Sequence, residues 1–261
     1  MRIAVVGDIH GNLPALEAVI ADAVTAGVDE MWCQGDICHG GPWPREALDL
    51  VIDRCSHITQ GDVDRANVEA KPWANEAEKP LWEAAEFVRT QVGTCGLSKL
   101  ASLPEVYRPP ERPGLTMRHA GPLSGVVPRI DAPEEAWLHA FGYEGGDFVF
   151  GHRHEAGIKR VAGMVLVCTG SVGAPFDGDP RAAYVVLDLT RADLGPTHRR
   201  VDYDRESTAR EFERIGPVGA WMARGIRQGV RAPAPWMALP KYRQDAGAER
   251  PRPGTSPSDG G

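Results

Sequence analysis

Residues 2–24 read RIAVVGDIHGNLPALEAVIADAV, and this stretch decides the fold class. Residues 2–7 form a short run rich in β-branched side chains, and its apolar residues 3–6 predict a buried strand. Asn12 is a suitable N-cap for a following helix. Apolar residues then recur at helical spacing, at Leu13, Leu16, Ile20 and Val24. A strand that passes directly into a helix indicates an α/β fold, with Asp8 and His10 at the turn between the two elements.

The same arrangement follows twice more along the chain. A strand is predicted over 30–34 and a helix over 44–54, with Asp36 between them. A third short strand over 57–61 leads into Asp62. Because open α/β sheets bind ligands at the carboxyl ends of their strands, we expect these acids to share one sheet edge with Asp8 and His10.

The remainder of the chain changes from alternating elements to short strands. A helix is predicted over 76–92 and helical composition over 205–229, with a break at Gly216-Pro217. Strands are predicted over 115–120, 148–150, 158–161, 165–168, 183–189 and 198–203. This order predicts two packed sheets with helices outside, in one domain over residues 1–229. Residues 230–261 form a Pro/Gly-rich tail with too little apolar surface to order itself; alternatively, Trp236, Met237 and Leu239 dock as a short segment.

Composition limits the class of partner. The chain has 261 residues, of which 42% are hydrophobic and 25% charged, as expected for a globular protein. Its formal net charge of -7 argues against strong nucleic-acid binding and suits a small anionic substrate held by metals. Neither a signal peptide nor a membrane-spanning run of about 18 apolar residues is evident, so we expect no membrane association and a cytoplasmic location. The sequence does not indicate the oligomeric state.

Acid and histidine clusters recur in the order GDIHGN, GDICHGGP, GDVD, RHAGP and GHRH. Carboxylates and imidazoles are donors suited to manganese, iron or zinc. A single such cluster is weak evidence, whereas five in order predict a hydrolytic centre with two metal ions. The candidate metal ligands are Asp8, His10, Asp36, Asp62, His119, His152 and His154.

The motifs GDIHGNLPALEAV, GDICHGGPWP, GDVDR, GHRH and TGSVGAPFDGDPRAAYVVLDL resemble those of the calcineurin-like metallophosphoesterases, and among them the small bacterial and archaeal phosphodiesterases. The resemblance implies an α/β fold that is a four-layer α/β/β/α sandwich of two packed mixed sheets. It implies two divalent ions, manganese first and iron or zinc as alternatives. It assigns one ion to Asp8, His10, Asp36 and His154, and the other to Asp36, Asp62, His119 and His152. Asp36 then bridges the two ions, and hydroxide held between them attacks the phosphodiester.

Two departures from the family pattern affect the expected chemistry. The third motif usually reads GNHD, but here Asp62 replaces the asparagine and Val63 replaces the histidine assigned as leaving-group acid. Three aspartates against two divalent ions leave a formal charge of about +1, which favours a monoanionic diester over a dianionic monoester. Loss of a general acid typically costs about 10²- to 10⁴-fold in rate, so we expect leaving groups that need little protonation, such as aryl esters.

Several further residues are candidates for the site. His39 is a surrogate acid or, alternatively, a solvated loop histidine, and Asp64 in GDVD is a further catalytic candidate beside Asp36 and Asp62. Arg65 and Arg153 are candidates for binding substrate phosphate. Trp43 either forms an aromatic wall for the substrate or packs under the following helix.

Two other functions remain open at this point. GDIHG also occurs in Ser/Thr protein phosphatases and dinucleoside polyphosphatases, but those groups have an arginine in GDxxxRG and a GNHE, where this chain has His39-Gly40 and GDVD. A scaffold subunit of the retromer coat resembles this fold and lacks the same histidine, so a non-catalytic binding scaffold is the alternative from another class. The complete ligand set ranks the enzyme first.

Overall fold

The computed structural model describes residues 1–69, 71–122, 126–142 and 145–238. Its first sheet has the strand order β10-β9-β1-β2-β3. The central strand β1 pairs in parallel with β2 and antiparallel with β9, so this sheet is mixed. Its strands are β1 (Arg2–Val6), β2 (Glu30–Cys33), β3 (His57–Ile58), β9 (Ala182–Asp188) and β10 (Thr197–Val201).

The second sheet also has five strands, in the order β4-β5-β6-β8-β7. Strands β5, β6 and β8 run parallel, while β4 and β7 lie antiparallel at the two edges. The strands are β4 (Val106–Tyr107), β5 (Leu115–Arg118), β6 (Asp147–Phe150), β7 (Ala156–Val161) and β8 (Met164–Thr169). The carboxyl ends of β1, β2 and β6 therefore carry the predicted ligand loops after them.

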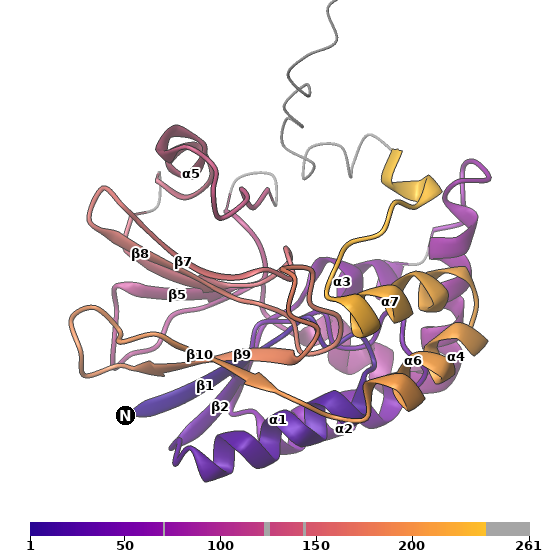
Figure 1. Cartoon of the computed structure of the whole chain (residues 1–261), viewed down its shortest axis with the longest axis horizontal. Helices are drawn as coiled ribbons and strands as arrows, with labels where there is room; N and C mark the ends of the chain where they lie inside the picture. The colour runs from indigo at the N-terminus through magenta and orange to yellow at the C-terminus, as the bar shows by residue number, and fades with distance from the viewer. Residues whose placement is uncertain (70, 123–125, 143–144, 239–261) are drawn as a thin grey trace, which may run out of the picture.

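Helices cover the outer faces of both sheets and one end of the molecule (Figure 1). Helices α1 (Leu13–Thr25) and α2 (Pro44–Arg54) lie below the first sheet, and α5 (Glu134–Phe141) lies above the second. The remaining helices gather at the end that also holds the ligand loops. They are α3 (Asp62–Glu69), α4 (Lys79–Ser102), α6 (Arg205–Arg214), α7 (Pro217–Gln228) and the 3₁₀ turn η1 (Pro235–Ala238).

Alternating side chains of β1 fill two different cores. Ile3 and Val5 pack between the sheets, whereas Ala4 and Val6 pack against the helices below. A strand buried on both faces reads as a continuous apolar run, which explains the sequence of residues 3–6. A third core lies between α5 and the second sheet. The predicted four-layer α/β/β/α sandwich of two mixed sheets is confirmed.

The predicted N-cap of the first helix and the predicted break at Gly216 are confirmed. Asn12 caps α1 by accepting a hydrogen bond from the backbone N–H of Ala15 at 3.2 Å. Helix α6 ends at Arg214 and α7 begins at Pro217, so the break at Gly216 is confirmed. The predicted end of the helix at residue 92 is wrong, because α4 continues to Ser102 through a kink at Gly93, whose φ is 64°. The sequence prediction also missed the short elements α3 and β4.

The segment after α7 docks on the domain. Trp236 is only 6% exposed and packs in one cluster with Val218. This supports the docking alternative for Trp236, whereas Leu239 and the rest of the predicted tail over 239–261 lie outside the described residues. Among the residues described, none of the helices is long and apolar enough to cross a membrane.

Candidate metal centre

The predicted ligands sit on strained backbone. Five of them have left-handed φ values: Asp8 (49°), His10 (52°), Asp36 (55°), His152 (71°) and His154 (59°). In the described part of the chain only Ala162 and Leu194 share this feature among non-glycine residues. Such a conformation costs about 1–3 kcal/mol per residue and persists where surrounding structure enforces it, typically at functional sites. The strain is thus concentrated in the loops after β1, β2 and β6.

Backbone hydrogen bonds hold the first two of these loops together. The N–H groups of Ile9 and His10 both donate to the carbonyl of Asp36, at 2.8 and 3.0 Å. Gly61 lies against the same loop so closely that a Cβ there would stand 2.0 Å from Asp36 Oδ1. Only glycine allows this approach. The fold therefore fixes where the Asp36 carboxylate points before any ligand binds.

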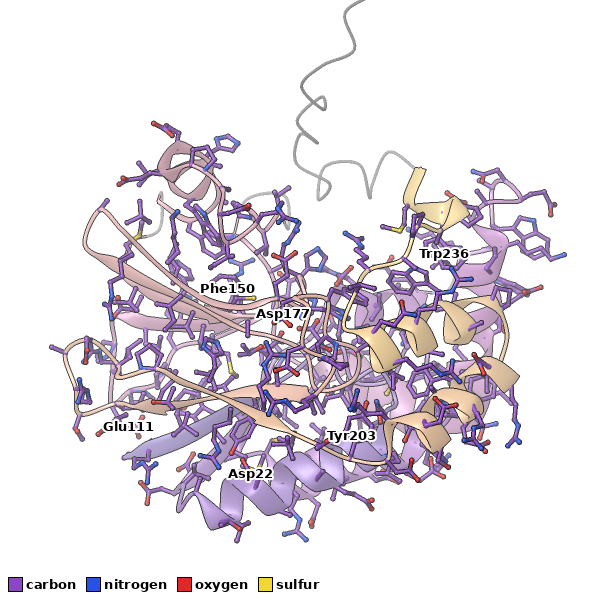
Figure 2. The ribbon with its side chains drawn as sticks, in the orientation of Figure 1. Asp22, Glu111, Phe150, Asp177, Tyr203 and Trp236 are labelled. Carbon is purple, nitrogen blue, oxygen red and sulfur yellow. The ribbon has the colours of Figure 1, made fainter. Side chains whose placement is uncertain are left out.

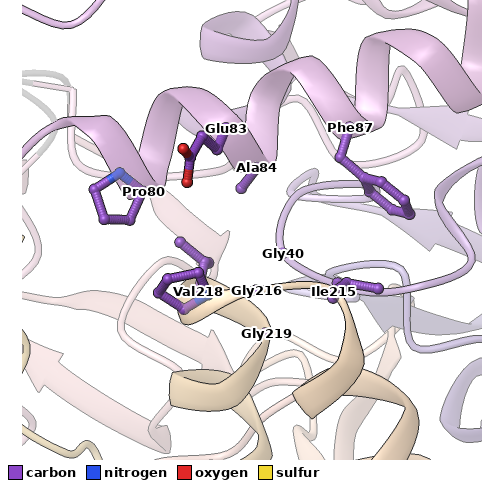
Figure 3. Close-up of a pocket in the computed structure, with 10 residues that line it drawn as sticks. Gly40, Pro80, Glu83, Ala84, Phe87, Ile215, Gly216, Val218 and Gly219 are labelled. Carbon is purple, nitrogen blue, oxygen red and sulfur yellow. The ribbon is translucent and has the colours of Figure 1, made fainter.

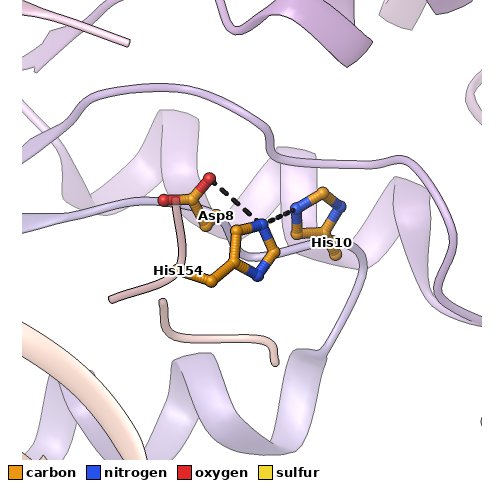
Figure 4. A group of neighbouring side chains, drawn as sticks. All are labelled: Asp8, His10 and His154. Atoms are coloured by element: carbon orange, nitrogen blue, oxygen red, sulfur yellow. Dashed lines mark hydrogen bonds and ion pairs between the residues drawn. The ribbon is translucent and has the colours of Figure 1, made fainter. Parts of the chain in front are cut away.

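Asp8, His10 and His154 form a first group (Figure 4). The Nε2 atoms of His10 and His154 lie 3.1 Å apart, and His154 Nε2 lies 3.5 Å from Asp8 Oδ1. Each ring donates its Nδ1–H to a backbone carbonyl, of His39 at 2.8 Å and of Ala174 at 2.7 Å. A carbonyl oxygen only accepts, so in the neutral rings both Nε2 atoms present lone pairs to each other. Facing lone pairs repel unless a cation lies between them, so this group fits a metal ion.

Asp62, His119 and His152 form a second group. Asp62 Oδ1 lies 2.9 Å from His119 Nε2 and 3.2 Å from His152 Nδ1. His119 Nε2 is buried and makes no hydrogen bond of acceptable geometry, which fits a metal-binding lone pair. Asp36 Oδ2 lies 3.1 Å from His119 Nε2 and 3.8 Å from His10 Nε2. Asp36 therefore stands between the two groups.

Gln34 links the two groups and was missed by the sequence prediction. Its side-chain carbonyl accepts the Nδ1–H of His119 at 2.7 Å, while its amide donates to Asp8 Oδ2 at 3.0 Å. Partners of this kind fix the tautomer and orientation of metal-binding side chains. The available signal was a fully buried polar side chain at the end of an apolar strand.

Burial makes negative charge costly in this site. It raises the pKa of Asp8 to about 7 and that of Asp36 to about 6, and the proximity of Asp36 adds to the shift at Asp8. Burial also lowers the pKa of His10 to about 3, which keeps that imidazole neutral. Partial burial opposes charge on Asp62 and full burial opposes charge on His119, but the positive charge of His152 lowers the pKa of Asp62 and the negative charge of Asp36 raises that of His119. Cations would offset the buried carboxylate charge, so the donor set fits divalent ions.

The structure gives Asp64 a different role from the catalytic one that was predicted. Its carboxylate is fully buried and accepts hydrogen bonds from the backbone N–H groups of Asp36 at 2.8 Å, Ile37 at 2.9 Å and Gly61 at 3.1 Å. Both carboxylate oxygens are thereby turned toward the loop backbone. Asp64 thus positions the Asp36 loop and is not itself a group of the reacting site.

The other predicted residues divide between the site and its surroundings. His39 lines the cavity beside the ligands and is 5% exposed, with Nδ1 2.8 Å from Asn67 Oδ1, so it is not a solvated loop residue. Arg153 also lines the cavity, but its guanidinium pairs with Glu155 at 2.9 Å. Arg65 instead pairs with Glu105 at 2.8 Å on the surface.

Trp43 follows neither of its two predicted alternatives, because it neither lines the cavity nor packs under the following helix α2. It packs against Phe212 of α6 with ring centroids 6.5 Å apart, in the core beneath α6 and α7. It caps the start of α2 and is not among the described residues that line the cavity. The aromatic wall of the site comes from elsewhere in the chain.

A cavity of about 100 Å³ opens over the two ligand groups. One side of it carries His10, Asp36, Asp62 and the GHRH histidines, together with Val63. The opposite side is built by α4, α7 and η1, and its residues were not predicted. A smaller cavity of about 50 Å³ lies between α4 and α7, where Glu83 and Phe87 face Ile215 and Val218 (Figure 3). Val218 separates the two cavities and lines both.

A family model described as a calcineurin-like phosphoesterase superfamily domain matches residues 1–192. The chain belongs to this superfamily. This phosphoesterase is similar to a crystal structure of a metallophosphoesterase from Sphaerobacter thermophilus, with 28% identity and a TM-score of 0.70, over 88% of this chain and 99% of that chain. A hypothetical protein from Pyrococcus horikoshii OT3, PH1004, shares the fold with a TM-score of 0.74 at 18% identity, over the same shares of the two chains.

Among curated proteins, the phosphoesterase is 29% identical to the uncharacterized protein MJ0912 of Methanocaldococcus jannaschii over 223 residues, which are 77% of this chain and 88% of that protein. Membership of the superfamily makes the protein a hydrolase. Together with the ligand groups, it makes the protein a metal-dependent phosphoesterase.

Proposed function

We propose that this phosphoesterase is a phosphodiesterase with a dinuclear metal centre, in which manganese, iron or zinc occupies both positions. The observation that carries the proposal is the pair of ligand groups on either side of Asp36. Asp8, His10 and His154 lie on one side, and Asp62, His119 and His152 on the other. When bound, divalent ions lower the pKa of a bound water from about 15.7 towards about 7 and neutralise phosphate oxygens.

The chain's own residues hold and orient this centre. Asp36 is the group placed to serve both positions, and its loop is fixed by Asp64. The Val63 N–H donates to Asp36 Oδ1 at 3.1 Å, which leaves Oδ2 directed at the histidines. Asp62 is the most solvent-exposed of the carboxylates, with 42% of its side chain accessible, and therefore stands at the entrance of the site.

The charge of the site supports a diester over a monoester. Asp62 adds a carboxylate where the family usually has an amide, so a monoanionic substrate is repelled less than a dianionic one. Val63 lines the cavity and cannot donate a proton to a leaving group. His39 lines the same cavity and is the titratable side chain that we propose as the surrogate acid. Replacing it with glutamine should slow alkyl esters at least about tenfold more than p-nitrophenyl esters.

The test combines metal analysis with a pair of substrates. Protein reconstituted with Mn²⁺ should bind about two ions and hydrolyse bis(p-nitrophenyl) phosphate with a higher kcat/KM than p-nitrophenyl phosphate. Asp62→Asn should bind the metals and shift the preference towards the monoester. A preparation that holds one ion with full activity would contradict the dinuclear centre, and an unchanged preference in Asp62→Asn would contradict the charge argument.

A further inference from the structure

The wall of the cavity opposite the ligands is apolar and comes largely from the last described part of the chain. Leu81 of α4 contributes from one side, Val218, Trp221 and Met222 from α7, and Trp236 and Met237 from η1. Figure 2 shows Trp236 above α7, at the end of the described chain. All but Leu81 lie beyond residues 1–192, which the family model matches.

A row of aromatic rings connects this wall to the ligands. Phe176 stacks on the ring of His154 with centroids 4.5 Å apart and an interplanar angle of 4°. Trp221 meets Phe176 edge-on at 5.3 Å, and Trp236 meets Trp221 at 6.1 Å. The substrate side of the metal centre thus continues without interruption into an aromatic surface.

Hydrogen bonds hold two of these aromatic residues in place. The indole N–H of Trp221 donates to the carbonyl of Ala232 at 2.6 Å, which ties the chain after α7 to the helix. The N–H of Phe176 donates to the carbonyl of His154 at 2.9 Å. A substituent bound against the wall would therefore meet hydrocarbon and ring faces.

The volume of the cavity and the charge of its lining also limit what it can bind. The cavity of about 100 Å³ is on the scale of the engineered apolar cavities of about 150 Å³ that bind benzene, so one ring is the size of group that it suits. Arg231 lines the same cavity as His10, Asp36 and Asp62, and it adds positive charge there. The two requirements of the site are thus an anionic group at the metals and an apolar ring beside it.

We propose that the wall formed by α7 and η1 binds a single apolar aromatic ring carried by the phosphoester, with Arg231 beside the phosphate. The proposal rests on the phosphoesterase centre described above and names its substrate class. Trp236 and Met237 then determine specificity, since they contact the ring and not the reacting atoms. Burial of an aromatic side chain is worth a preference of about 10- to 100-fold.

The experiment compares phenylphosphonate with methylphosphonate, which share the anionic group and differ in the ring. Calorimetric titration of the full Mn²⁺-loaded chain should give a Kd about tenfold or more lower for phenylphosphonate. Trp236→Ala should reduce this ratio to below about 3. The matched control Trp73→Ala removes a tryptophan that is 39% exposed and is not among the residues that line the cavity, and it should retain the wild-type ratio.

Two further variants keep the test decisive if Trp236→Ala fails to fold. Leu81→Gln places an amide in the α4 side of the wall and should also lower the ratio. Arg231→Gln should weaken both phosphonates by a similar factor of about 3- to 10-fold, because it acts on the shared anionic group. Equal binding of the two phosphonates by the wild type, or a ratio insensitive to both wall variants, overturns the proposal.

Hydrolysis assays distinguish failure of the ring pocket from failure of the phosphodiesterase function. Turnover of methyl p-nitrophenyl phosphate by a protein that does not prefer phenylphosphonate would refute the ring pocket and still support the phosphodiesterase function. A protein that binds two metals and shows the phenyl preference but hydrolyses only monoesters would contradict the diester proposal and support the pocket.

Discussion

Replacing Asp64 with alanine should destabilise the protein without removing any metal ligand. The Asp64 carboxylate satisfies three buried backbone N–H groups, those of Asp36, Ile37 and Gly61, at 2.8 to 3.1 Å. The side chain is fully buried, so water does not reach these donors in the native fold. Asp64→Ala leaves all three without a partner.

The size of the effect follows from the cost of an unsatisfied buried donor, about 1–3 kcal/mol each. Three donors give a loss of about 3 kcal/mol at the lower end. For a chain of this length, 1 kcal/mol corresponds to about 2–4 °C, so Tm should fall by about 6–12 °C. Asp64→Asn should lose less, because its remaining carbonyl oxygen still accepts from part of the loop.

The assay is thermal and urea unfolding in the presence of a chelator, which removes any contribution from metal binding. Asp53→Ala is the matched control, since the Asp53 side chain is 69% exposed on α2 and its loss should shift Tm by no more than about 2 °C. If Asp64→Ala unfolds within about 1 kcal/mol of the wild type, the role assigned to this carboxylate is refuted.

Three other perturbations test separate features. Burial lowers the pKa of His198 from 6.5, and its Nε2–H donates to the carbonyl of Cys168 at 2.7 Å. The unfolded chain therefore takes up this proton first as pH falls below about 6.5, so urea stability should drop more between pH 7.5 and 5.5 in the wild type than in His198→Gln. Gly61→Ala should displace the Asp36 carboxylate, lower the metal content and lower kcat/KM at least about 100-fold. Gly114→Ala is the control, because a Cβ at Gly114 has open space, and it should keep both properties. Retained metal in Gly61→Ala would contradict the close approach of Gly61 to Asp36. Arg65→Gln should leave kcat/KM within about twofold, because Arg65 pairs with Glu105 on the surface, and a tenfold rise in KM would restore its predicted role in substrate binding.

The local pattern of the sequence was sufficient for the layers and for the ligand loops. Residues 3–6 are apolar at every position because this part of β1 is buried on both faces, and Asn12 caps the helix that follows. These features depend on neighbours within a few residues, so they are visible in the chain itself. The same holds for the clusters after β1 and β2, since the ends of neighbouring parallel strands meet at one edge. The cluster after β6 belongs to the second sheet and reaches the others through the packing of the two sheets.

The partners of individual side chains were decided only by the tertiary structure. Trp43 and Arg65 lie next to ligand motifs in sequence but turn to Phe212 and Glu105. Trp236 lies more than 80 residues from the last ligand, His154, and yet packs on the ring of Trp221, which lines the cavity. Periodicity fixes which face of an element is buried, whereas the packing of α7 and η1 over the loops depends on contacts between distant segments. The sequence therefore determined the fold and the candidate ligands, and the folded chain decided which residues surround the substrate.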